Sequence, residues 1–268
     1  MTRQRLPMEL IFQVFGLLIA FIIVHGIYVT VIRPGADAFL TLEQERLAKD
    51  PNHVSGRNFK VVLRDYEQES CLVLMLWALT ILGYKGVTAY QHSRQLDEDL
   101  LQLPEGLPIG PEDTKELQSR LDNLSPHEHG YLPTRALRAG IQRFGATRDV
   151  QDSATAAREI CESEGERMES ELSTIRYIAW AIPSVGFIGT VRGIGTALSQ
   201  ANRAVEGDIT GVTQSLGVAF NSTFIALIIS IVLMFFIHQL QLMQERLVLD
   251  TRVYCDSNLV SRLRVRPF

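Results

Sequence analysis

The stretch at 181–200, AIPSVGFIGTVRGIGTALSQ, sets polar side chains in an apolar background. It carries the hydroxyl of Thr190, and a second apolar stretch carries Asn221, Ser222 and Thr223 in succession. A single hydroxyl in an apolar helix costs little, because it can bond back to a carbonyl of its own helix. So many polar groups in two adjacent stretches predict more than this, namely a polar seam that faces a cavity or another helix.

Arg192 is the most demanding residue of the first stretch. A charged side chain in mid-membrane costs at least roughly 2.5–3.5 kcal/mol, and such residues usually face water or a partner. We therefore consider Arg192 a possible electrostatic gate or partner contact. It also stands only about two turns before residue 200, so reaching to the membrane surface remains an alternative.

Carboxylates are absent from the apolar stretches of the chain, with Glu9 and Glu69 at their edges. His25 and His238 stand near the ends of such stretches. Proton movement through a membrane usually needs a titratable group inside it. If this chain lines an ion path, the sequence predicts that another chain supplies the carboxylate.

Small residues recur around Pro183, at Gly186, Gly189 and Gly193. The last two form a G-x-x-x-G pattern, which lets two membrane helices approach closely. One tight helix contact would account for the glycines alone, but not for the hydroxyls beside them. We therefore expect this face to pack closely against another helix along the polar seam.

The polar residues belong to two of four apolar stretches long enough to cross a hydrocarbon core of about 30 Å. The sequence predicts an all-α integral membrane protein, although the mean hydropathy of the chain is only +0.09. Buried core helices of a soluble protein are the less favoured interpretation. The four predicted spans are 9–32, 69–90, 176–199 and 211–241.

The intervening segments indicate how the chain is oriented. The predicted spans separate a tail (1–8), a loop (33–68), a helical region (91–175), a short loop (200–210) and a C-terminal helix (242–268). Helical periodicity continues from 152 into the third span and from the fourth span beyond 241, so both helices should extend out of the bilayer. Basic residues number 16 in the tail, helical region and C-terminal segment, against seven in the two loops. This bias favours termini and helical region in the cytoplasm and both loops in the periplasm.

Several other classes of function find little support. GFIGTVRGIG lacks the G-x-G-x-x-G spacing and no G-K-[ST] follows it, which disfavours nucleotide binding. Cys71, Cys161 and Cys255 are odd in number and scattered, so no disulfide framework is implied. The run 127–129 (HEH) has no second ligand cluster. We expect no enzyme activity, no cofactor, no resident metal and no nucleic-acid partner.

The segment ESELSTIRYIAWAIPSVGFIGTVRGIGTAL together with LGVAFNSTFIALIISI resembles the MotA/TolQ/ExbB proton channel family. The resemblance covers close to the last 40% of the chain, and it places Thr190 and Thr223 at the family's two threonine positions. Val218 stands where the ExbB/TolQ branch carries a glutamate, so a specialised motor of the same family is the preferred interpretation.

The resemblance implies an ion-driven motor in a bacterial inner membrane. It implies a homopentamer around two helices of a MotB/TolR/ExbD-like single-span partner dimer, whose aspartate carries H⁺ or Na⁺. Thr190, Thr223, Ser222 and Asn221 would lie along the ion pathway, because a hydroxyl can donate to a carboxylate or accept from its acid form. The alternative is a non-conducting membrane scaffold or receptor-like protein that recruits partners through its cytoplasmic region.

Overall fold

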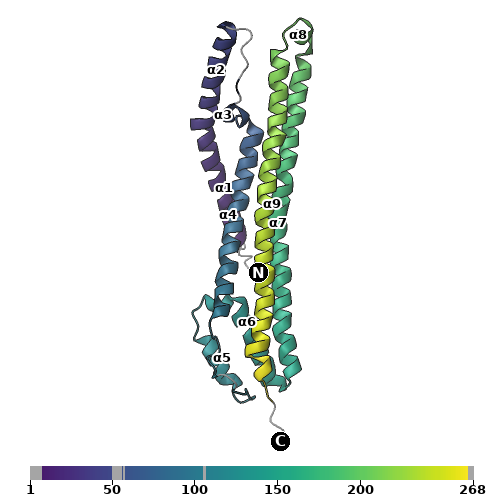
Figure 1. The fold of residues 1–268 in the computed structure, drawn as a ribbon. Coiled ribbons are helices and arrows are strands. Elements are labelled where there is room, and N and C mark those ends of the chain that lie inside the picture. Colours follow the sequence, from purple (N-terminus) through teal and green to yellow (C-terminus); the bar gives the residue numbers. More distant parts are fainter. Residues whose placement is uncertain (1–7, 50–55, 57, 105–106, 265–268) are drawn as a thin grey trace, which may run out of the picture. The chain divides into compact units, whose positions relative to one another are not determined.

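A computed structural model describes residues 8–49, 56, 58–104 and 107–264 of the chain (Figure 1). In these residues no strand forms, and a single isolated bridge pairs Ile109 with Leu263. The elements in chain order are α1 (Met8–Ile27), η1 (Tyr28–Ile32), α2 (Arg33–Lys49), α3 (Phe59–Val62), α4 (Tyr66–Arg94), η2 (Gln95–Asp97), α5 (Thr114–Asp122), η3 (Glu128–Gly130), α6 (Leu132–Thr147), α7 (Val150–Ser199), α8 (Ala201–Val205), α9 (Thr210–Asn258) and η4 (Val260–Arg262).

Four helical stretches of the described chain are long and apolar enough to cross a membrane. Their most apolar windows have mean hydropathies of 2.5, 1.7, 1.3 and 2.4, in chain order. The stretches are Ile11–Arg46, Tyr66–Asp97, Val150–Ser199 and Thr210–Arg262. By length and composition, these helices are those of an all-α protein that crosses a membrane several times.

The first helix continues beyond the point where the sequence predicts a loop. α1 passes into η1, a turn of π-helix, and then into α2 without a break. Pro34 has no N–H to donate to the Thr30 carbonyl, and the wider π-helical turn η1 lies directly before this proline. The predicted loop at 33–68 is therefore largely helical in its first half, because the Glu, Gln, Arg and Lys residues of this segment have high helix propensity.

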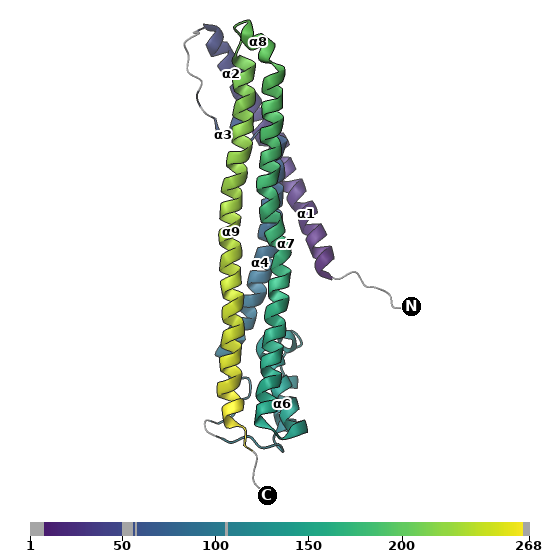
Figure 2. The same cartoon turned by 90° about the vertical axis from the view of Figure 1, so that its right-hand side faces the viewer.

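The two long helices confirm the continuity predicted from the sequence. α7 has 50 residues and α9 has 49, and they lie side by side in two perpendicular views (Figures 1 and 2). Pro183 lies inside α7 and has no N–H for the carbonyl of Ala179. The Ser230 hydroxyl of α9 donates to that carbonyl at 3.0 Å, so the neighbouring helix replaces the missing donor.

The chain divides into two compact units, and the long helices contribute to both. The first unit comprises Met1–Leu82 and Thr174–Ile237, and it contains every predicted site residue. In it α1, α4, α7 and α9 supply buried small and aliphatic side chains such as Ala20, Ala78, Ala219 and Ala226. Small side chains at these positions allow the helices to pack closely.

The second unit comprises Gly83–Ser173 and His238–Phe268. Its core is formed by α5 and α6, which pack on each other, together with the parts of α4, α7 and α9 that belong to this unit. The fully buried members of this core include Leu117, Leu121, Leu132, Leu137, Ile141, Phe144 and Leu259. The prolines and glycines of 101–113 and 125–133 separate its helices, as the sequence predicts.

A chain of ion pairs joins three helices of the second unit. Arg135 of α6 contacts Glu164 of α7 at 2.7 Å, and Arg167 bridges Glu164 and Glu171 at 3.3 and 3.1 Å. Glu171 then contacts Lys85 of α4 at 2.6 Å. The Lys85 side chain is only 9% exposed, and Glu171 neutralises its charge.

Candidate functional site

The glycines of the third span lie against α9. A Cβ at Gly193 would stand 2.7 Å from Ala219 Cβ and 2.8 Å from both the Ala219 nitrogen and the Ser215 carbonyl oxygen. A Cβ at Gly189 would stand 2.5 Å from Ser222 Cβ. Gly186 faces Ala226 in the same way. Only residues without a side chain allow α7 and α9 to approach this closely, which is the contact that the G-x-x-x-G pattern predicts.

Thr190 and Thr223 face each other across this contact, and their hydroxyls are hydrogen-bonded. Thr190 Oγ1 also lies 3.0 Å from the Ala219 carbonyl oxygen of α9, and Thr223 Oγ1 lies 3.2 Å from the Gly186 carbonyl oxygen of α7. Each hydroxyl has a single hydrogen, so one donates to a carbonyl while the other donates to its neighbour. The pair can exchange these roles without moving an oxygen, which suits it to serve either a carboxylate or a carboxylic acid.

Ser222 and Asn221 take different positions beside this pair. Ser222 is buried, donates to the Val218 carbonyl at 2.9 Å and accepts from Gln68 of α4 at 3.3 Å. Asn221 is half-buried, and among the described contacts no hydrogen bond joins it to either threonine. It precedes Thr223 by two residues, which turns it to another face of the helix. Of the predicted polar residues, three therefore lie together and Asn221 lies apart.

Arg192 is bound within its own chain. Its Nε and Nη2 lie 2.7 and 2.8 Å from the two oxygens of Glu67, and Nη2 lies 3.5 Å from Asp65. Both carboxylates stand at the start of α4, and their side chains are 11% and 14% exposed. Burial raises the pKa of the Asp65 carboxyl above its ordinary value, and the Arg192 charge acts in the opposite direction. The guanidinium is therefore neutralised at the α4–α7 contact and is not a free cation.

A second cluster of charges lies on the same unit, around Glu69. This carboxylate, 8% exposed, accepts from His25 of α1 at 2.7 Å and from Arg33 of α2. The Arg33 guanidinium also stands 4.4 Å from the Tyr66 ring centroid. Glu69 thus fixes the first helix to α4 at the level where the sequence predicts a span edge.

Sequence reasoning missed the acidic start of α4 as part of the site. The run DYEQES at 65–70 precedes the second span directly, and Arg192 has no opposite charge on its own helix within reach. Two features together could have revealed this pairing. One is an arginine without a counter-charge in one span, and the other is an excess of acidic residues at the end of another span. The separation of 125 residues hides this pairing from any local pattern.

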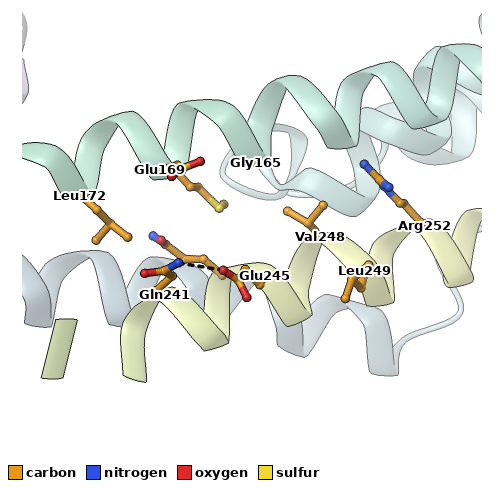
Figure 3. A pocket seen from close by; sticks show the side chains of 10 residues that line it. Gly165, Glu169, Leu172, Gln241, Glu245, Val248, Leu249 and Arg252 are labelled. Atoms are coloured by element: carbon orange, nitrogen blue, oxygen red, sulfur yellow. Dashed lines mark hydrogen bonds between the residues drawn. The ribbon is translucent and has the colours of Figure 1, made fainter. Parts of the chain in front are cut away.

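The remaining candidate sites are modest. A groove of about 360 Å³ lies between α7 and α9 in the second unit (Figure 3). Its apolar floor is bordered by charged and amide side chains, and Gln241 donates to Glu245 there at 2.9 Å. The lining residues are Gly165, Met168, Glu169, Leu172, Gln241, Gln244, Glu245, Val248, Leu249 and Arg252. In the 127–129 loop, His129 contacts the Leu124 carbonyl and Glu128 accepts from Ser125, and no described group of three or more His, Cys, Asp or Glu could hold a metal.

Comparison with known proteins bears on the segment that holds the threonine pair. A model of the MotA/TolQ/ExbB proton channel family matches residues 131–252. No curated protein and no solved structure matches the chain. The matched segment contains α6, the whole of the third span and most of α9, and its family supports a general ion-channel or stator-type role. Residues 131–252 of this chain are therefore similar to the MotA/TolQ/ExbB proton channel family.

Proposed function

We propose that this chain is the channel-forming stator subunit of a membrane motor driven by a proton or sodium gradient. Five copies surround two helices of a MotB/TolR/ExbD-like single-span partner, and an aspartate of that partner carries the ion. The assembly lies in a bacterial inner membrane with the N- and C-termini of this chain in the cytoplasm. No catalytic step on a substrate is part of this proposal.

The observation that carries the proposal is the hydroxyl pair of Thr190 and Thr223 inside the matched segment. One hydroxyl can turn its hydrogen from a helix carbonyl to a carboxylate, and a hydroxyl oxygen can accept from the acid form. Residues 176–199 and 211–241 contain no Asp or Glu, so neither helix of the pair supplies a titratable carboxylate of its own, and the proposal assigns the ion-carrying carboxylate to the partner.

Assembly is tested first, by native mass spectrometry of the protein in mild detergent. The chain is measured alone and after co-expression with a candidate single-span protein that has an aspartate in its membrane segment. We expect five copies of this chain with two copies of the partner. A monomer or dimer that retains no such partner contradicts the motor and favours the non-conducting scaffold.

Ion passage is tested with Thr223→Val in proteoliposomes of the same complex. Valine keeps the branched shape and removes the hydroxyl, so flux should fall by at least about tenfold, the factor that corresponds to about 1.4 kcal/mol in a barrier. Thr196→Val is the matched control, because the Thr196 side chain is exposed and bonds only to the Arg192 carbonyl of its own helix. Equal flux in both variants contradicts the role of the hydroxyl pair.

A further inference from the structure

Glu67 lies where α4, α7 and α9 meet. The space left by Gly189 brings it to the seam, since a Cβ at Gly189 would stand 3.1 Å from Glu67 Cγ and 2.6 Å from Ser222 Oγ. Ser222 directly precedes Thr223, so the carboxylate borders the same seam as the threonine pair. The chain therefore supplies one carboxylate of its own next to the predicted ion pathway.

Gln68 provides a second and independent observation at this place. Its side chain is fully buried, and its Nε2 donates to the Val62 carbonyl at 3.1 Å and to Ser222 Oγ at 3.3 Å. Its Oε1 is buried with no hydrogen-bond partner among the described residues. An amide oxygen left in this state costs free energy, so a hydrogen bond or a cation at this position would stabilise it. Such an oxygen accepts a hydrogen bond from water and can coordinate a hard cation.

Arg192 is shared between two carboxylates, which lie at unequal distances from its guanidinium group. It holds Glu67 closely, at 2.7 and 2.8 Å, and Asp65 more loosely, at 3.5 Å. The three groups carry a formal charge of −1, so a single cation balances them. Arg64, the other nearby cation, lies 3.3 Å from Asp37.

We propose that Glu67 and the Gln68 amide oxygen form an entry station, at which an H⁺ or Na⁺ ion replaces Arg192 as the counter-charge of Glu67. Arg192 then moves onto Asp65, and the ion passes by Ser222 to the Thr190–Thr223 pair. This inference rests on the proposed function and adds a residue of this chain to the ion pathway. Arg192 is a positioning residue in it, because it acts through Glu67 and leaves when the ion arrives.

The properties of Asp65 support the exchange. Its pKa is raised by burial, and a closer Arg192 stabilises the charged carboxylate. Glu69 does not compete for Arg192, because His25 and Arg33 already hold it. The exchange therefore leaves the remaining charges of the cluster paired.

The test uses proteoliposomes of the complex with its single-span partner, with a pH-sensitive dye for H⁺ and ²²Na⁺ for sodium. The wild-type complex and Thr223→Val establish first that the complex conducts along the seam. Glu67→Gln should then lower the flux of the conducted ion by at least about tenfold. Arg192→Gln should lower the ion concentration at half-saturation, because the guanidinium that competes for Glu67 is gone.

A charge swap separates an entry station from a purely structural ion pair. The double variant Glu67→Arg with Arg192→Glu can restore the pair and hence the thermal stability, but it removes the carboxylate from α4. We expect restored stability with flux still reduced at least about tenfold. Flux restored by the swap, or wild-type flux in Glu67→Gln while Thr223→Val is inactive, overturns the entry station and leaves the proposed function intact. A wild-type complex that conducts neither ion overturns both.

Discussion

Replacement of Gly193 by alanine places a methyl group against the backbone of α9. The new Cβ would lie 2.8 Å from the Ala219 nitrogen and 2.8 Å from the Ser215 carbonyl oxygen. Carbon and its neighbours prefer separations of about 3.5–4.0 Å, so α7 and α9 have to separate by about 1 Å. Backbone atoms cannot rotate away as a flexible side chain can, and the strain spreads into the Thr190–Thr223 contact.

The matched control is Gly195→Ala on the same helix. Gly195 is exposed, and a Cβ there would meet no atom within 4 Å. Both substitutions gain about 0.8–1.0 kcal/mol of helix propensity, which cancels in the comparison. The difference is the cost of overpacking, about 1–3 kcal/mol. At 2–4 °C for each kcal/mol, Gly193→Ala should unfold roughly 2–12 °C below Gly195→Ala.

Thiol labelling during heating measures this difference in detergent. The three cysteines of the chain are free and buried, so a maleimide dye reacts with them only as the structure opens. Cys71 of α4 reports on the first unit, because its thiol donates to the Ile182 carbonyl of α7 at 3.6 Å. Mass spectrometry of the labelled peptides separates Cys71 from the other two cysteines.

Labelling of Cys71 should shift to lower temperature in Gly193→Ala and stay at or above the wild-type temperature in Gly195→Ala. Equal midpoints for the two variants would refute the reasoning, because they would mean that α7 and α9 do not approach each other at this glycine. The same outcome would remove the physical basis for the threonine contact.

Two further predictions concern stability and use the same thermal assay. Ser230→Ala removes the donor to the α7 carbonyl that the proline leaves free, and it should cost about 1–3 kcal/mol. Ser184→Ala, whose hydroxyl bonds only within its own helix, should change stability by less than about 0.5 kcal/mol, so equal losses would contradict this role. Glu164→Gln removes a carboxylate that is 2% exposed, and it should lower the free energy of unfolding by about 1–2 kcal/mol. This loss is smaller than that expected for a fully buried ion pair, because the Arg135 side chain is 35% exposed. Glu116→Gln, in an exposed pair, should cost no more than about 0.5 kcal/mol, and a loss as large as that of Glu164→Gln would contradict the importance of burial.

The sequence predicted the long helices because their physical cause is local. Predominantly apolar runs of about 20 residues set the four spans, and the periodicity of charged and apolar residues carried α7 and α9 beyond them. Prolines and glycines marked the breaks before α5 and α6. The segment predicted as a loop from residue 33 is helical in its first half, because polar composition indicates solvent contact and does not prevent a helix.

The polar seam was partly predictable. Hydroxyls at Thr190 and Thr223 and glycines at Gly189 and Gly193 indicated a close and polar contact between two spans. Their spacing on each helix is a local property, so it shows which residues share a face. It does not show which helix covers that face. Asn221 was grouped with Thr223 by residue type, although the separation of two residues turns it to another face of the helix.

The sequence by itself determined the class of the protein, its four apolar helices and the residue types of the seam, since composition and helical period act over short distances. The tertiary structure alone decided the charge pairs. Arg192 with Glu67, Glu69 with His25 and Lys85 with Glu171 join residues 44 to 125 positions apart. A buried charge requires an opposite charge nearby in space, and only packing of the helices brings the two together.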